Sequence, residues 1–257
     1  MIRQAPILLL LLGIGACTHS DGNPLPEPIA RLENLLLAPP TSPLGDWLLV
    51  GRFEVTREEF GLAADVRGAH LPVVLVSYEE AVAWSEDQGL RLPTLREWQF
   101  LASDAGSMTS VSASARNGLH LNLGRPLPVG VFERGRTALG AYDFFGNVRE
   151  WVFDPIENRF FACGGSFASA DASALEWEQM ELEPTERTND VGFRYVANAT
   201  TYFMTQVAPE WSSLDTAQRA EVILFLGDWR SKSRVALGAR LRAAGAPRDL
   251  ADLVSGA

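Results

Sequence analysis

The sequence has 257 residues, of which 47% are hydrophobic, so it is long enough to bury a sizeable core. We therefore expect one main domain with a smaller additional part. The formal net charge of −10 at pH 7 argues against nucleic acid as a partner, because proteins that bind nucleic acid present basic surfaces. With only two cysteines, Cys17 and Cys163, no framework of several disulfides is expected.

Residues 1–16 are interpreted as a targeting segment. Arg3 supplies a positive charge, Ile7–Leu12 form an apolar run, and small residues precede Cys17. The run is too short to span a bilayer as a helix of the mature protein. The segment Ile14–Cys17 resembles the bacterial lipobox, which implies that Cys17 is lipidated and becomes the first residue. An ordinary signal peptide or an ordinary buried start is the alternative.

A lipidated Cys17 predicts a lipid-anchored protein of the cell envelope. Each acyl methylene buried in the membrane contributes about 0.8 kcal/mol, so several chains would anchor it firmly. Thr18 follows the cysteine, and by similarity to Gram-negative sorting this favours the outer membrane, facing the periplasm or the cell surface. Residues 17–44 carry Gly, Pro and Ser and are predicted to form a tether, although Ile29–Leu37 is apolar enough for a short helix.

The next stretch predicts short strands and helices. The β-rich segments Trp47–Thr56 and Pro72–Val76 are expected to form strands. Ser77-x-x-Glu80 is a capping box that opens a helix, which is expected to end at Gly89. Thr94-x-x-Glu97 repeats this arrangement for a second helix. We assign these features to the fold and not to chemistry.

The stretch from Leu139 to Phe167 places acids among aromatic residues. Asp143 and Glu150 need partners there, because an unpaired buried charge is very costly. Gly146 permits a sharp turn, so that backbone carbonyls and the two carboxylates converge on a hard cation such as calcium. The alternative is a turn in which the acids cap backbone amides.

The same stretch carries a family resemblance. G-x-Y-D-x-x-G-N-V-x-E-W, from Gly140, followed by G-G-S-F, resembles the formylglycine-generating enzyme (sulfatase-modifying factor) family. Further matching motifs are F-E-V-T at Phe53–Thr56, R-L-P-T-x-x-E-W at Arg91–Trp98 and G-F-R at Gly192–Arg194. The resemblance covers residues 45–198. It implies an α+β class fold, irregular and C-type-lectin-like, with short helices and small antiparallel sheets.

The resemblance also implies a structural calcium ion. Asp143 and Glu150 would supply side-chain oxygens, and Gly146 and Val148 would supply backbone carbonyls, which suits a cation that takes 6 to 8 oxygen ligands. Asn122-Leu123-Gly124 resembles part of another calcium site of the family, but the acids that would complete it have no evident match.

Copper is not expected. Enzymes of this family oxidise a cysteine of a target protein with two copper-binding cysteines. The first lies three residues after the serine of G-G-S, here Ser166, and the second lies five residues later. Those positions hold Ser169 and Ala174, which offer no thiolate for Cu(I). Cys163, surrounded by phenylalanines, is interpreted as a packing residue.

Two other branches of the family are considered. One binds iron through clustered histidines, but the three histidines lack metal-binding spacing: His19, His70 and His120. The other acts in the periplasm in siderophore maturation, without the copper cysteines. That similarity implies an acid-based site near a groove of Ser166, Ser169 and Arg194. Its acids would be Asp171, Glu176 and Glu178, with Arg187 or Arg194 pairing with them; solvated loop charges are the alternative.

The resemblance ends near Asn198, and residues 199–257 are predicted to form a helical C-terminal appendage. Ser212-x-x-Asp215 caps a helix expected to reach Trp229, Val235–Ala243 forms another, and Pro247 begins a third. The simplest interpretation is a helical cap packed on the domain. A docking element for another envelope protein, formed by Leu226, Trp229 and Val235, is the alternative.

Two hypotheses for function follow. The first is a lipid-anchored envelope protein whose domain lacks the copper cysteines and acts as a non-catalytic binding or scaffold module for an envelope protein or peptide ligand. The second is a periplasmic enzyme of the same family, with oxidase-like maturation of a protein, peptide or siderophore-type substrate at a non-copper site near Ser166.

Overall fold

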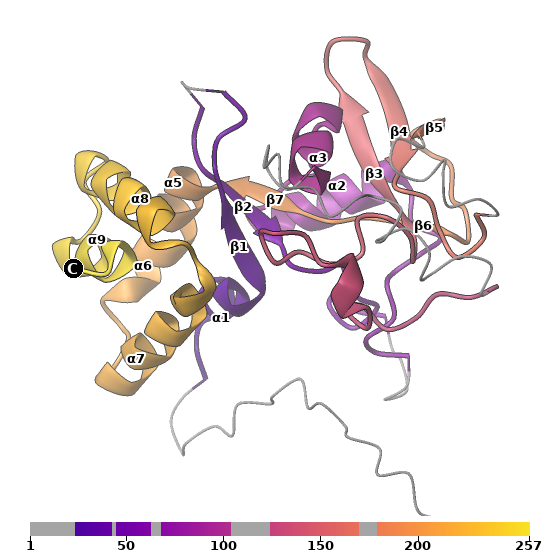
Figure 1. Cartoon of the computed structure of the whole chain (residues 1–257). Helices are drawn as coiled ribbons and strands as arrows, with labels where there is room; N and C mark the ends of the chain where they lie inside the picture. Colours follow the sequence, from indigo (N-terminus) through magenta and orange to yellow (C-terminus); the bar gives the residue numbers. More distant parts are fainter. Residues whose placement is uncertain (1–23, 43–44, 63–67, 104–123, 170–178) are drawn as a thin grey trace, which may run out of the picture.

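The computed structural model describes residues 24–42, 45–62, 68–103, 124–169 and 179–257. Short helices and two small sheets give an α+β fold, as predicted. Figure 1 shows the three-stranded sheet in the middle of the molecule, with the C-terminal helices on one side and the four-stranded sheet on the other. Among the described residues, no helix is both long and apolar enough to cross a bilayer.

The central sheet joins the two ends of the chain. Its strands, in the order β1-β2-β7, pair antiparallel. They are β1 (Leu35–Ala38), β2 (Leu48–Gly51) and β7 (Val196–Asn198). Every residue of β1 and β2 is buried, which explains their continuous apolar sequences, because such runs suit strands covered on both faces.

The predicted tether is wrong for residues 24–38, and the alternative of a short helix over Ile29–Leu37 is correct only as far as Asn34. They form helix α1 (Glu27–Ala30), the 3-10 helix η1 (Arg31–Asn34) and β1. Ile29 and Leu32 are fully buried. The partners of these apolar side chains lie in the C-terminal helices, far along the chain, so local composition could not reveal that the segment is part of the core.

The second sheet carries the motif-rich stretch. Its strand order is β5-β4-β3-β6, and β6 pairs parallel to β3, which differs from the expected purely antiparallel sheets. The strands are β3 (Arg149–Asp154), β4 (Arg159–Cys163), β5 (Gln179–Glu181) and β6 (Val191–Gly192). Trp151 of β3 is fully buried and donates a hydrogen bond from Nε1 to the Val76 carbonyl at 2.9 Å.

Both predicted capping boxes are present. They begin α2 (Tyr78–Asp87) and α3 (Leu95–Ala102). The short 3-10 helix η2 (Glu133–Gly135) lies in the later loop. The strand predicted at residues 72–76 is wrong, since only Pro72 forms a bridge, to Thr56. Leu75 takes a left-handed φ of 59°, which ends the extended conformation.

The C-terminal part is helical, as predicted. Its elements are α5 (Ala199–Tyr202), the π-helix η4 (Phe203–Val207), α6 (Ala208–Trp211), α7 (Thr216–Phe225), η5 (Leu226–Asp228), α8 (Ser231–Ala243) and α9 (Arg248–Ser255). The predicted cap Ser212-x-x-Asp215 is wrong, because Ser212 ends α6, while Asp215 is itself the cap of α7 and forms a capping box with Gln218. Helix α7 ends at Phe225 and not at Trp229.

The predicted docking cluster is mostly core. Leu226 is fully buried and Trp229 is 4% exposed, whereas only Val235 lies at the surface. Trp229 Nε1 donates to the Leu35 carbonyl at 2.8 Å. The helices therefore share one hydrophobic core with the central sheet and do not form a detachable appendage.

Candidate functional site

The loop that precedes β3 has an unusual backbone. Asp143 and Asn147 take left-handed φ values of 63° and 55°, and Gly146 has a φ of 122°. Asn and Asp tolerate this region better than other residues with side chains, because their short polar groups bond nearby backbone. These three residues explain why the D-x-x-G-N pattern folds into a compact loop.

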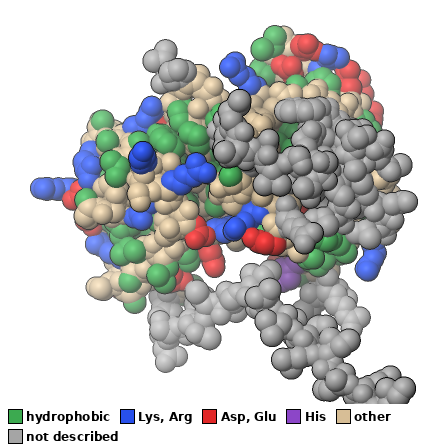
Figure 2. Space-filling model, in the orientation of Figure 1, with side chains coloured by type: hydrophobic (Ala, Val, Ile, Leu, Met, Phe, Trp, Pro, Cys, Tyr) green, Lys and Arg blue, Asp and Glu red, His purple; other side chains and the backbone are tan. Residues whose placement is uncertain are grey.

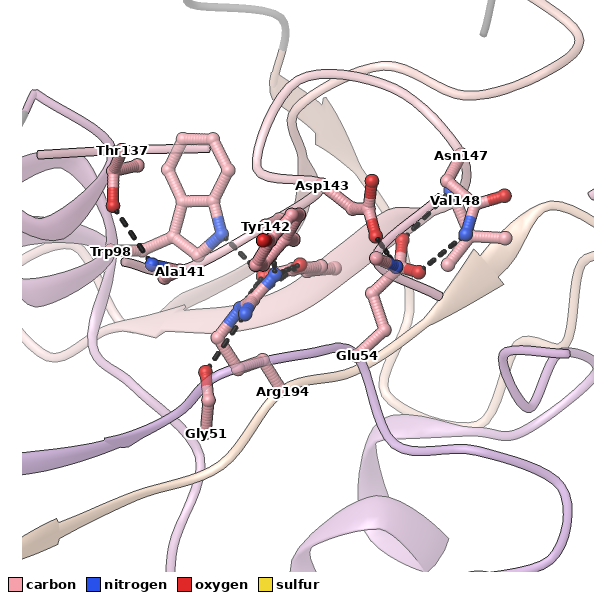
Figure 3. A network of polar contacts seen from close by, with 12 residues as sticks. Gly51, Glu54, Trp98, Thr137, Ala141, Tyr142, Asp143, Asn147, Val148 and Arg194 are labelled. Atoms are coloured by element: carbon pink, nitrogen blue, oxygen red, sulfur yellow. Dashed lines mark hydrogen bonds and ion pairs between the residues drawn. The ribbon is translucent and has the colours of Figure 1, made fainter. Parts of the chain in front are cut away.

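Asn147 and Glu54 fix this loop from inside. Asn147 Nδ2 donates to Glu54 Oε2 at 2.6 Å, and Val148 N donates to Glu54 Oε1 at 3.0 Å (Figure 3). The Asn147 side chain also exchanges two hydrogen bonds with the backbone of Leu127. Glu54 is 1% exposed. Its burial, followed by the nearby charges of Asp143 and Glu150, raises the pKa of its carboxyl group well above the usual value.

Arg194 is the cation at the centre of this polar region. Its side chain is fully buried and lies 2.6 Å from Glu150 in an ion pair. The guanidinium also donates to the carbonyls of Gly51, at 2.8 Å, and Tyr142, at 2.6 Å (Figure 3). It lies over the ring of Phe144, 4.2 Å from the centroid. Arg194 therefore joins the G-F-R motif to the loop and to β2.

Glu150 was predicted to be a calcium ligand, but in the structure its carboxylate pairs with Trp98 and Arg194. One carboxylate oxygen accepts from Trp98 Nε1 at 2.8 Å, and both accept from Arg194. Asp143 accepts from Gly130 N at 2.7 Å. Within the described ranges, no group of three or more His, Cys, Asp or Glu side chains is placed to hold a metal ion. Glu150 thus does not fit a cation site, because Arg194 already neutralises it.

Ser166 and Ser169 belong to a second buried network. Ser166 is fully buried, and its hydroxyl donates to Asp190 at 2.7 Å and accepts from Arg149 at 3.0 Å. Ser169 accepts from Arg149 at 3.2 Å and from Ser166 N at 3.0 Å. Arg149 also forms an ion pair with Asp190. The predicted groove of Ser166, Ser169 and Arg194 is therefore wrong for the described residues: all three side chains are interior and hold the fold.

Two other predictions concern single residues. Cys163 is 1% exposed, and burial raises the pKa of its thiol to about 12, so it stays protonated and acts as a packing residue. Arg187 pairs with Glu80 of the first capping box at 2.6 Å. Several predicted positions lie outside the described residues: Cys17, Asn122, Leu123, Asp171, Ala174, Glu176 and Glu178.

Three important residues were not identified from the sequence. Glu54 appeared only as a letter of the F-E-V-T motif, and Arg149 and Asp190 were not singled out. An acid inside an apolar strand motif is a usable signal for Glu54, since such a group needs buried partners. The Arg149–Asp190 pair had no local signal, because its members lie 41 residues apart.

Comparison with known proteins agrees with the motifs. A family model described as "Sulfatase-modifying factor enzyme 1-like domain" matches residues 54–199, which is more than half of the chain. A protein named hercynine oxygenase from Mycobacterium tuberculosis is 36% identical over 123 residues, or 43% of this chain and 27% of the relative. The Mycolicibacterium smegmatis protein of the same name is 36% identical over 110 residues, or 39% of this chain and 26% of the relative.

The chain thus spans only about a quarter of the length of these curated relatives. Among solved structures, the crystal structure of CarF has a TM-score of 0.49 and 20% sequence identity, and the match covers 59% of this chain and 86% of CarF.

Proposed function

Because the chain belongs to the family of sulfatase-modifying factor enzyme 1-like domains, we propose that it is a lipid-anchored cell-envelope protein whose domain is a non-catalytic binding or scaffold module. The observation that carries this proposal is the place of Ser169. By resemblance, this position holds a copper-binding cysteine in the active enzymes, and here its hydroxyl accepts hydrogen bonds from Arg149 and Ser166. A residue used in this way stabilises the fold and offers no thiolate to copper.

A titration with Cu(I) in competition with a colorimetric chelator tests the loss of copper chemistry. We expect no stoichiometric copper binding by the wild-type chain and no oxidation of a cysteine-containing peptide. The S169C/A174C variant, which restores both thiols, is the matched control for the assay. Stoichiometric Cu(I) on the wild-type chain, together with oxygen consumption in the presence of the peptide, would refute the proposal.

Anchoring through Cys17 is tested by fractionating cells that produce the full chain or C17S. We expect the wild-type chain in the outer-membrane fraction and C17S in the soluble or inner-membrane fractions. Equal distribution of the two chains would contradict a lipid anchor. A peptide or envelope-protein ligand would then be sought with the anchored wild-type chain.

A second candidate is an enzyme of the same family with a non-copper site. The relatives' name, hercynine oxygenase, supports it, but that name describes proteins of which this chain spans only a quarter. The burial of Ser166, bonded to Asp190, weighs against a reactive site at this serine. A screen for oxygen consumption with thiol-containing small molecules distinguishes the candidates.

We also propose that calcium binds to the carboxylate of Asp143 and the backbone carbonyls of Gly146 and Val148. Glu150 is not part of this proposed site. We expect calcium, and not magnesium, to raise the Tm of the wild-type chain by a few degrees in a thermal unfolding assay. D143N should lose this shift. E150Q should lower the Tm in calcium and in chelator alike, because it breaks the pairing with Arg194. An identical Tm of the wild-type chain in calcium and in chelator would rule out a stabilising ion.

A further inference from the structure

A cavity of about 320 Å³ lies where the C-terminal helices meet the central sheet. Its lining combines apolar and polar residues: Leu37, Pro39, Leu139, Arg230, Ser231, Lys232 and Ser233. A neighbouring cavity of about 270 Å³ shares Leu139 and is lined also by Arg52 and Arg136. The two cavities adjoin at Leu139. The smaller one is also lined by Asp228, and the larger one contains the beginning of α8.

The larger cavity contains cations without acidic partners. In the part of the chain that the structure describes, the Arg230 side chain donates only to the Ala138 carbonyl, at 3.3 Å, and the Lys232 side chain has no partner. By contrast, Arg52 and Arg136 of the neighbouring cavity form ion pairs with Asp228 and Glu133. Figure 2 shows basic side chains on the face where the helical part meets the rest of the molecule. In a chain with a net charge of −10, two such unneutralised cations favour an anionic ligand.

The backbone at this point also favours an anion. Helix α8 has 13 residues, and no side chain of the described residues caps its first turn. Among the described residues, the N–H groups of Ser231 and Lys232 have no acceptor. Free amides and the helix dipole make a helix N-terminus attractive to negative charge.

Ser233 provides an independent indication of a ligand. It lines the cavity and is only 6% exposed. Its hydroxyl has no hydrogen-bond partner among the residues that the structure describes, and its oxygen is not fully enclosed by protein, so a molecule in the cavity can reach it. A ligand oxygen in the cavity would satisfy it.

We propose that this cavity binds the phosphate group of a phosphate ester. The ammonium of Lys232 and the guanidinium of Arg230 supply charge. The two free amides and the Ser233 hydroxyl supply directed donors for the phosphate oxygens. The wall of Leu37, Pro39 and Leu139 accommodates an apolar part of the ester. Such a phosphate is carried either by a soluble metabolite or by the headgroup of an anionic phospholipid.

Calorimetric titration of the full chain with inorganic phosphate and with glycerol phosphate tests the proposal. We expect saturable binding that chloride does not abolish. R230Q/K232Q should weaken it by about tenfold, and S233A should weaken it several-fold. R248Q is the matched control, because it removes a charge from a side chain that is 93% exposed and away from the cavity. It should bind like the wild-type chain.

Thermal unfolding of each variant shows whether it is folded, and the exposed Arg230 and Lys232 keep the proposal testable if S233A is unstable. Flotation of the full chain with phosphatidylglycerol vesicles, compared with phosphatidylcholine vesicles, distinguishes a phospholipid headgroup from a soluble phosphate ester. Vesicle binding lost in R230Q/K232Q identifies a lipid headgroup, and binding of glycerol phosphate alone identifies a soluble ester. No binding of any of these probes, or binding that R230Q/K232Q and S233A leave unchanged, would overturn the proposal.

Discussion

Two polar regions of this molecule use arginine in opposite ways. Around Arg194 the guanidinium is fully buried, and Glu150 and two carbonyls neutralise and bond it. At the start of α8, Arg230 is exposed and lacks an acidic partner among the described residues. A charge whose partners are internal holds elements together, whereas a charge left without a partner is available to a ligand. The comparison assigns stability to the first region and binding to the second.

Removing the buried cation should have the largest effect. R194M leaves Glu150 buried and unpaired, so we expect the free energy of unfolding in urea to fall by about 3–5 kcal/mol. R187M breaks the exposed pair with Glu80 and serves as control, with a much smaller change expected. E150L/R194M, which removes both charges, should recover part of the loss. The assignment fails if R194M is no more destabilising than R187M.

The bond between Trp229 and β1 tests whether the junction beside the binding cavity is firmly held. W229F keeps an aromatic ring but leaves the Leu35 carbonyl without its indole donor, which should cost about 1–3 kcal/mol in urea unfolding. W211F is the matched control, because Trp211 donates to Asp249, whose side chain is 55% exposed and can bond water instead. Equal losses of unfolding free energy in W229F and W211F would show that the hydrogen bond to Leu35 stabilises the fold no more than the exposed one to Asp249.

Glu54 should make stability fall as pH rises. Its folded-state pKa lies above the ordinary value of 4.5, so the folded state binds the proton more tightly than the unfolded state. The resulting stabilisation is present below pH 4.5 and is lost as pH rises through the folded-state pKa. Urea unfolding of the wild-type chain and of E54Q, from below pH 4.5 upward, measures how the free energy of unfolding changes with pH. The same pH dependence in both chains would contradict the prediction for Glu54.

Glu80 should make the smallest contribution to the pH dependence of stability, and it should make stability fall as pH falls. The hydrogen bond from Arg187 is the largest of the contacts that together lower the pKa of the Glu80 carboxyl group to about 2. The stabilisation is therefore present above pH 4.5 and is lost as pH falls toward 2. Because the pair is exposed, we expect at most about 1 kcal/mol. The free energies of unfolding of the wild-type chain and E80Q should differ above pH 4.5 and converge as pH falls toward 2, whereas a difference that does not change with pH would point to the capping role of Glu80 instead.

Local patterns predicted the local features of the fold well. Ser77 and Thr94 form the predicted capping boxes, because each box depends on residues three positions apart. The box predicted at Ser212 lies three residues too early, since Asp215 is the cap of α7. The motif at residues 140–151 identified the family and showed that Asp143 and Glu150 need partners. It did not identify those partners, since Arg194 lies 44 residues beyond Glu150.

The sequence by itself determined the family, the α+β class, the starts of α2 and α3 and the substitution of serine and alanine at the copper positions. All of these depend on residue identity or on short spacing. Tertiary structure alone decided that residues 24–38 are core, that Leu226 and Trp229 are interior, and that Ser166 faces Asp190. Within the described ranges, it also left Arg230 and Lys232 without acidic partners beside Ser233. These features depend on contacts between side chains that are far apart in the sequence. The free energies of burial and of charge pairing depend on those contacts, which the local sequence does not specify.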